Sequence, residues 1–144
     1  MTSEPRATTL VAGDDLTPLS WHSGPANWTR FAAVNDEFVG IHIDDSIAQR
    51  AGFPGAIGMG NLQYSYMHIA LREWFGADSV IEKVDIRFKQ PNLKDQTLTI
   101  AGRVTGVSPD GGGIRVELDL SVTADDGATT SAGAAVVRVA VGGS

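Results

Sequence analysis

The sequence predicts an α+β fold in which an antiparallel β-sheet wraps around one long central helix. Two observations support this prediction. Residues 61–75 form a long apolar segment of helical character, which Gly76 ends. After Gly76 the period of the apolar residues changes from 3.6 to 2, which is typical of strands with one buried face. The chain has 144 residues, so we expect a single domain that spans residues 1–144.

The segments before the long helix are short. Residues 1–9 are polar and lack periodicity, so we expect a flexible N-terminal tail, and one short strand is expected within residues 10–20. A first helix is predicted at about residues 25–35, because Pro25 suits a first-turn position and Ser23 can cap it. A second short helix follows, which Asp44 or Asp45 can cap and Gly52 ends.

The predicted long helix is apolar around most of its circumference. Its polar positions share one stripe, at steps of four, three and four residues: Asn61, Ser65, His68 and Arg72. Tyr64, Tyr66 and Met67 lie off this stripe, so we expect them in the core. A helix this apolar is expected to be covered by other structure on nearly every side.

Four strands with alternating apolar residues are predicted after the helix. They run through residues 80–89, 97–104, 114–122 and 137–141. The turns between the last three read S-P-D-G-G-G and A-D-D-G-A, so these strands form an antiparallel meander with one buried face.

Composition argues against several classes of function. The net charge is −6 and no basic cluster is present, so a nucleic-acid partner is not expected. The chain has no cysteine, which excludes disulfides, thiolate metal sites and cysteine nucleophiles. No window approaches the about 18 apolar residues that span a bilayer, and the first residues are polar and not signal-like. We therefore expect a soluble, cytoplasmic protein without a membrane partner.

The residues that can do chemistry are concentrated between Val34 and Leu62. Glu37 precedes His42 by five residues, and glycines punctuate the turn that leads into the long helix. An acid and a histidine that converge on one water molecule can act as a general acid–base pair. Structural interpretations stay open beside this one: a histidine between two isoleucines is commonly a core residue, acids in a loop are commonly solvated, and glycines commonly serve turn geometry.

This stretch resembles the signature of the MaoC-like dehydratases, a hotdog-fold family that includes R-specific enoyl-CoA hydratases and 3-hydroxyacyl-thioester dehydratases. That signature reads approximately S-G-D-x-N-P-I-H-x-D, then A, then G-F, then I-x-H-G-x-L. The corresponding residues here are N-D-E-F-V-G-I-H-I-D, Ala48, Gly52-Phe53 and I-G-M-G-N-L. R-F-K-Q-P-N-L-K-D-Q-T-L, downstream, is similar to the family's strand and Pro-containing turn, so the resemblance covers about residues 25–140.

Three elements of the family pattern are replaced here. Glu37 replaces the aspartate, Val39-Gly40 replace Asn-Pro, and Met59 replaces a histidine. The first change moves a carboxylate by about one methylene in a site where displacement is costly. Asp36, beside Glu37, is a substitute acid.

The resemblance implies a lyase that hydrates trans-2-enoyl-CoA with R stereochemistry, or dehydrates 3-hydroxyacyl thioesters in reverse. Glu37 and His42 are then the catalytic pair, and the Gly60 backbone N–H at the helix N-terminus is the oxyanion donor. The same stretch supplies the expected substrate-binding positions: Asp36, Val39, Gly58, Met59 and Asn61. No metal or cofactor is required, because CoA is part of the substrate.

The resemblance also implies partners and leaves rival functions open. We expect a CoA or acyl-carrier thioester as substrate, and a homodimer or a heteromer with another hotdog subunit. Arg87 and Lys89, on the non-core face of their strand, are either solvated charges or contacts for CoA phosphates. One rival is a catalytically silent hotdog subunit that binds the acyl chain or partners an active subunit. Another is an acyl-CoA thioesterase, which the spacing of His42 disfavours.

Overall fold

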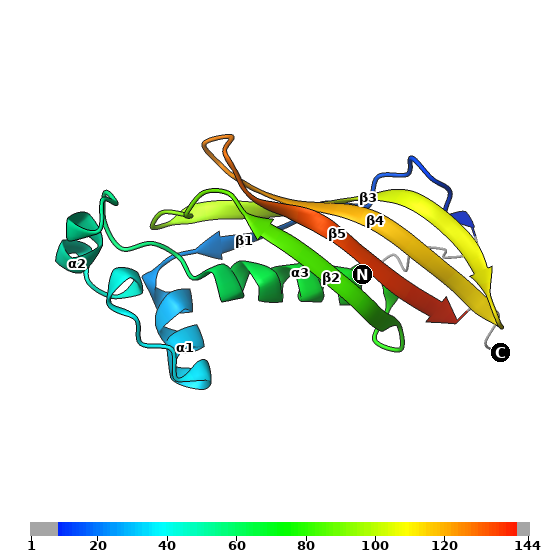
Figure 1. The fold of residues 1–144 in the computed structure, drawn as a ribbon, viewed down its shortest axis with the longest axis horizontal. Coiled ribbons are helices and arrows are strands. Elements are labelled where there is room, and N and C mark those ends of the chain that lie inside the picture. The colour runs from blue at the N-terminus through cyan, green and yellow to red at the C-terminus, as the bar shows by residue number, and fades with distance from the viewer. Residues whose placement is uncertain (1–8, 141–144) are drawn as a thin grey trace.

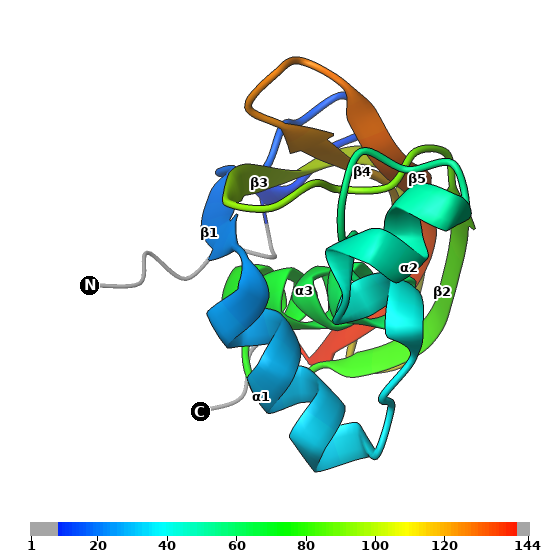
Figure 2. The same ribbon diagram turned by 90° about the vertical axis from the view of Figure 1, so that its left-hand side faces the viewer.

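A computed structural model describes residues 9–140 of the chain, and the predicted tail therefore lies almost wholly outside the described residues. A five-stranded antiparallel sheet has the order β1-β3-β4-β5-β2. Its strands are β1 (Leu19–Ser23), β2 (Val80–Phe88), β3 (Gln96–Asp110), β4 (Gly113–Ala124) and β5 (Thr129–Ala140). The sheet curves over one long helix, α3 (Gly60–Phe75), as the sequence predicts (Figures 1 and 2).

One side of α3 packs against the sheet and forms the core. Met67, Ala70 and Leu71 are fully buried, and they belong to the same cluster as the inward-facing residues of β3, β4 and β5. The opposite side is open: Tyr64 is 38% exposed and Ile69 is 43% exposed. The prediction that α3 is covered on nearly every side, with Tyr64 in the core, is therefore wrong. The sheet covers one side of the helix, and apolar content alone does not reveal which side stays uncovered.

The strands differ from the predicted ones in extent and in one register. β3 and β5 are longer than predicted, and the strand expected within residues 10–20 is found at Leu19–Ser23. A register shift between Ile81 and Lys83 interrupts the pairing of β2 with β5. Val80 and Phe88, predicted on the core face of β2, are half exposed. The register shift accounts for Val80, because it changes which side chains face the core. Phe88 lies beyond the shift in regular register, at the end of this edge strand.

Two short helices and a 3₁₀ turn lie beyond the N-terminus of α3: α1 (Pro25–Asn35), η2 (Gly40–His42) and α2 (Asp45–Arg50) (Figure 2). Gly24, not Ser23, caps α1, because the Ser23 hydroxyl is buried at the end of β1 and accepts from the indole N–H of Trp28 (3.0 Å). Asp44 caps α2 as predicted. No helix within residues 9–140 is long and apolar enough to cross a membrane.

Candidate active site

His42 is held in one orientation by the loop that precedes α3. Its Nδ1 lies 2.8 Å from the carbonyl oxygen of Ile57. A carbonyl can only accept, so Nδ1 carries the hydrogen, and in the neutral ring Nε2 is left with its lone pair. The Ile57 N–H in turn donates to the Ile41 carbonyl (3.0 Å). The two chain segments therefore fix His42 in the tautomer that a general base needs.

A cavity of about 330 Å³, here called the α3 pocket, lies at the N-terminus of α3. It is lined by His42, Phe53, Ile57, Gly58, Gly60, Gln63, Phe88, Lys89, Gln90 and Pro91. Gly60 opens α3, and its N–H has no acceptor among the described residues. The Gly58 N–H, in contrast, donates to the Asn92 carbonyl (2.8 Å). Of these two amides, the one open to an anionic ligand is that of Gly60, at the positive end of the helix dipole.

Close packing explains why both of these positions are glycine. A Cβ on Gly58 would lie 2.0 Å from Oδ1 of Asn92, and a Cβ on Gly60 would lie 3.0 Å from the ring of Phe88. Asn92 is itself buried, and its Nδ2 donates to Ser23 Oγ (3.0 Å). The loop that follows β2 therefore forms a wall of the α3 pocket and positions the segment just before α3.

Glu37 reaches the same end of α3 from the other side. It follows α1, is half buried, and its Oε2 accepts from Nδ2 of Asn61 at 3.3 Å. No hydrogen bond joins Glu37 to His42 in the described structure. The two groups of the predicted pair thus approach the N-terminus of α3 separately, one held by Asn61 and the other by Ile57.

The remaining predicted substrate-binding residues lie in different surroundings. Asp36 is exposed in a left-handed conformation at the C-cap of α1, and its carboxylate has no hydrogen bond among the described residues. Val39 is largely exposed and borders neither the α3 pocket nor the cavity described next. Met59 is buried and faces away from the α3 pocket, in the wall of that second cavity.

The second cavity, here called the α1 pocket, also ends at His42. It has about 180 Å³ and is lined by Pro25, Trp28, Thr29, Ala32, Phe38, His42, Ile43, Ala56, Met59 and Lys94. Trp28 and Met59 are each only 1% exposed and form its inner wall, while Phe38 and Ile43, at 60% and 57% exposed, form its outer wall. His42 borders both cavities.

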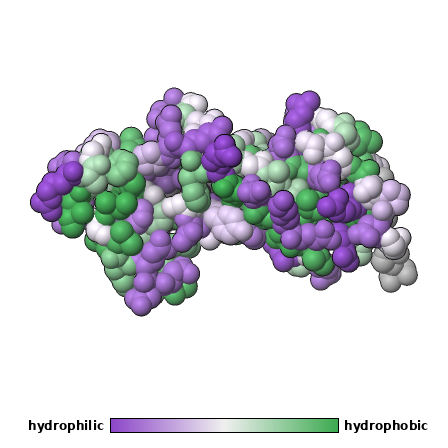
Figure 3. All heavy atoms as spheres, in the orientation of Figure 1, coloured by the Kyte–Doolittle hydropathy of each residue, from purple (hydrophilic) through white to green (hydrophobic). Residues whose placement is uncertain are grey.

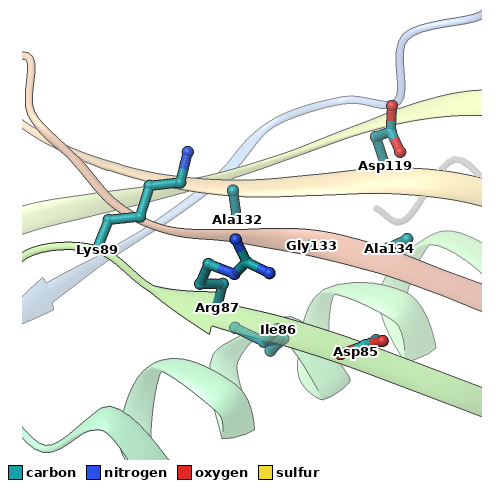
Figure 4. Close-up of a pocket in the computed structure, with 8 residues that line it drawn as sticks. All are labelled: Asp85, Ile86, Arg87, Lys89, Asp119, Ala132, Gly133 and Ala134. Atoms are coloured by element: carbon teal, nitrogen blue, oxygen red, sulfur yellow. The ribbon is translucent and has the colours of Figure 1, made fainter.

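A larger hollow of about 590 Å³ lies on the outer face of the sheet, next to the α3 pocket. Figure 4 shows Arg87 and Lys89 on one side of it and Asp85 and Asp119 on the other, with small residues of β5 between them. Lys89 is the residue that this hollow shares with the α3 pocket. Neither Glu37 nor His42 lines this hollow, so it is separate from the predicted acid–histidine pair.

Two carboxylates fix the segments around His42. The Ser46 hydroxyl and the N–H groups of Ile47 and Ser46 hold the pKa of Asp44 below its ordinary value. The Ala56 N–H and the Lys94 ammonium do the same for the pKa of Asp45. Asp45 thereby ties α2 to the segment before α3 (Ala56 N to Oδ1, 2.9 Å). Within residues 9–140, no three His, Asp or Glu side chains gather in a way that could hold a metal ion.

Gln63 lines the α3 pocket but was not among the predicted site residues. This residue is 2% exposed, and its Oε1 accepts from the hydroxyls of Thr130 (2.7 Å) and Ser131 (2.9 Å). A signal was present, since Gln63 is a polar residue off the polar stripe of α3. Phe88 also lines this pocket, which the periodicity did not indicate.

Known structures with the same architecture define the class. The (R)-hydratase from A. caviae involved in PHA biosynthesis is 27% identical, with a TM-score of 0.83 over 92% of this chain and 99% of that one. The R-hydratase PhaJ1 from Pseudomonas aeruginosa is 20% identical (TM-score 0.85; 95% and 86% covered). The ChsH1-ChsH2 complex from Mycobacterium tuberculosis has a chain that is 19% identical (TM-score 0.80; 91% and 98% covered). The chain is therefore a hotdog-fold protein.

The family follows from the sequence match. Residues 2–126 match the family model of the MaoC like domain, so the chain belongs to the MaoC-like dehydratase family. No curated protein sequence matches it significantly. The predicted fold and the predicted family are thus both confirmed.

Proposed function

We propose that this protein hydrates trans-2-enoyl-CoA to the (R)-3-hydroxyacyl-CoA, or catalyses the reverse dehydration. One observation carries the proposal: the α3 pocket combines a histidine whose Nδ1–H is committed to a carbonyl with an unoccupied N–H at a helix N-terminus. The first is a group that can take a proton from water, and the second is a group that stabilises an enolate-like oxyanion. The R stereochemistry is taken from the two R-hydratases named above.

The chemistry needs a water at C3 of the substrate and a proton at C2. Water adds to C3 while its proton passes to the acid–histidine pair, and the pair delivers one proton to C2, so that water is consumed and the protein is unchanged. Negative charge grows on the thioester oxygen during this step, and the Gly60 N–H lies where the helix dipole favours it. A water bound between Glu37 and His42 would bring the two groups into one reaction without direct contact.

Two positive charges at the C-terminal end of β2 support CoA as the carrier of the acyl group. Lys89 borders both the α3 pocket and the outer hollow, and Arg87 lies beside it (Figure 4). If the thioester of an acyl-CoA enters the α3 pocket, the rest of the bound CoA would extend out of the pocket along this side, where cations can contact its phosphates.

Exposed apolar surface supports an assembly with a second hotdog subunit. β2 lies at the edge of the sheet, and Val80 and Phe88 on it are half exposed. Further exposed apolar residues lie on α1, on α2 and on the segment that joins them: Val34, Phe38, Val39, Ile43 and Ile47. Figure 3 shows hydrophobic surface at this end of the molecule. An unpaired strand edge beside apolar surface is a natural site for a partner, and we propose a homodimer or a heteromer.

A second function is favoured by one specific observation. The carboxylate of Glu37 is bonded to Asn61 and not to His42, which suits a hotdog subunit that shapes the acyl site of an active partner without doing chemistry itself. The ChsH1-ChsH2 structure is of a complex between two chains. In that case the isolated protein would bind acyl-CoA and leave it unchanged.

The deciding measurement is the loss of absorbance of the conjugated enoyl thioester when the purified protein is mixed with crotonyl-CoA or bulkier enoyl-CoAs. The substitutions Glu37→Gln and His42→Ala should each lower kcat by about 10²–10⁴-fold, as expected for general acid–base groups. His68→Ala and Glu73→Gln are matched controls, because both residues lie on α3 outside the two cavities.

Three outcomes would contradict the hydratase. A folded wild-type protein that is inert on every substrate would favour the silent subunit. Release of free CoA thiol would indicate a thioesterase. Full activity in both Glu37→Gln and His42→Ala would show that catalysis does not use these two residues.

A further inference from the structure

The carboxamide of Gln63 is used at only one of its two ends. Its Oε1 accepts hydrogen bonds from Thr130 and Ser131, at 2.7 and 2.9 Å. Its Nε2 has no hydrogen-bond partner among the described residues. The two hydroxyls of β5 thus orient the amide and leave its two N–H donors unused.

The unused donors open into the α3 pocket. Every fully buried side-chain nitrogen or oxygen in the described part of the chain has a hydrogen-bond partner. Nε2 of Gln63 has none, so it must reach open space even though the residue is only 2% exposed. The open space that Gln63 borders is the α3 pocket, which it shares with His42 and Gly60.

Helix geometry directs Gln63 toward Gly60. The two residues are three apart in α3, so they lie on the same face. Side chains on a helix lean toward its N-terminus, over the turn that precedes them. The carboxamide of Gln63 therefore leans over the first turn of α3, where the unoccupied N–H of Gly60 begins the helix.

We propose that Gln63 is the second oxyanion donor of this site: its Nε2 and the Gly60 N–H donate to the same thioester carbonyl oxygen. This inference rests on the proposed function for the reaction, although the binding of a thioester carbonyl does not depend on turnover. It also gives the site a second donor in place of the Gly58 N–H, which is occupied by the Asn92 carbonyl. The specific ligand class is an acyl thioester, bound through its carbonyl oxygen.

Two substitutions distinguish the role of the Gln63 N–H donor from the effects of side-chain size and of charge. Gln63→Glu keeps the size and the oxygen that accepts from Thr130 and Ser131, but places an acceptor in the pocket. Gln63→Met removes the donor without adding charge; it also removes the oxygen that accepts from Thr130 and Ser131, which the Glu variant keeps. Both should lower kcat for crotonyl-CoA by about 10²-fold with a smaller change in KM, as for the loss of one oxyanion donor. Gln49→Glu, the same change on α2 outside both cavities, should behave as wild type.

The carbonyl stretch of bound butyryl-CoA, labelled with carbon-13 at the carbonyl, gives a readout that needs no turnover. Difference infrared spectroscopy should show this band at lower wavenumber on the wild-type protein than in water, and less displaced on Gln63→Met. If the wild type is inert on enoyl-CoA but this difference is present, the hydratase proposal fails and the Gln63 proposal stands. If the band is the same on both proteins, the Gln63 proposal is overturned, whether or not activity has fallen. A protein that does not bind butyryl-CoA overturns both.

Discussion

The α3 pocket and the α1 pocket meet at His42, but they are built from different kinds of residues. Trp28, Ala32 and Met59 in the α1 pocket are each 1% exposed and belong to the main core cluster. The α3 pocket combines buried walls, at Ile57 and Gln63, with an open side formed by Phe88, which is 51% exposed. Its polar groups, Gln63 and the Gly60 N–H, have capacity for a ligand, whereas the α1 pocket is mainly apolar.

Because the two cavities differ in this way, substitutions in them should have different effects on stability and on activity. Residues that wall the α1 pocket hold α1 against the rest of the molecule, so their loss should appear in the free energy of unfolding. The half-exposed wall of the α3 pocket, at Phe88, adds little to the core, so its loss should appear in substrate binding and turnover, whereas a buried wall position such as Gly58 should also affect stability. Four substitutions or conditions test this division.

The largest effect is expected from Trp28→Ala in the α1 pocket. The change removes a buried indole and its hydrogen bond to Ser23, so the free energy of unfolding should fall by about 3–5 kcal/mol. Chemical denaturation followed by circular dichroism measures this. A loss below about 1 kcal/mol would mean that α1 is not anchored through this cavity.

Gly58→Ala tests the wall between the α3 pocket and the core. The new Cβ would overlap Oδ1 of Asn92, so the loop must shift, at a cost of about 1–3 kcal/mol in the free energy of unfolding. Gly112→Ala is the matched control, because a Cβ there has nothing within 4 Å. Equal stability of the two variants would show that the Asn92 contact does not constrain Gly58.

Phe88→Ala should separate binding from stability. Because the ring is half exposed, unfolding should change by less than about 1 kcal/mol, while the KM for crotonyl-CoA rises about tenfold through lost apolar contact. Val80→Ala is the control, since Val80 lies on the same strand with the same exposure but outside the α3 pocket. Steady-state kinetics gives the KM of both variants, and chemical denaturation gives their free energies of unfolding. A large stability loss with unchanged KM would break the proposed division.

The smallest effect is expected from acid. The pKa values of Asp44 and Asp45 are lowered in the folded protein, by the Ser46 hydroxyl and by the Ala56 N–H respectively as the largest causes. Their contribution is therefore complete above the ordinary pKa of 3.8 and is lost as the pH falls through the lowered values. Hydrogen-exchange protection factors of the Ser46 and Ala56 amides should fall in that range. The Ala70 amide inside α3 is the internal reference, and a parallel loss there would indicate global unfolding instead.

Local signals in the sequence were sufficient for most of the fold. The predicted helices at 25–35 and 61–75 correspond to Pro25–Asn35 and Gly60–Phe75, because helical periodicity, Pro25 and Gly76 are properties of neighbouring residues. Asp44 caps α2 for the same reason. The meander of β3, β4 and β5 follows from alternation and turn residues, and all of these are read within about a dozen positions.

The candidate site was only partly accessible to such reasoning. The spacing of Glu37 and His42 drew attention to one segment, and the structure brings this segment to the first turn of α3. It did not reveal that Asn61 holds Glu37, that the Ile57 carbonyl fixes the tautomer of His42, or that the Gly58 N–H is occupied. These contacts depend on distances between loops, which composition and spacing do not contain.

Near neighbours in the chain encode the helices, the strands and the segment in which an acid and a histidine precede glycine-rich backbone, so these features could be predicted. Which side of α3 is covered and what Gln63 faces depend on contacts between distant parts of the chain. Its amide is oriented by hydroxyls 67 and 68 residues away, on a strand that reaches α3 only through the sheet order. A side chain's role in a cavity depends on which distant groups satisfy its hydrogen bonds, and that is settled when the sheet closes over the helix.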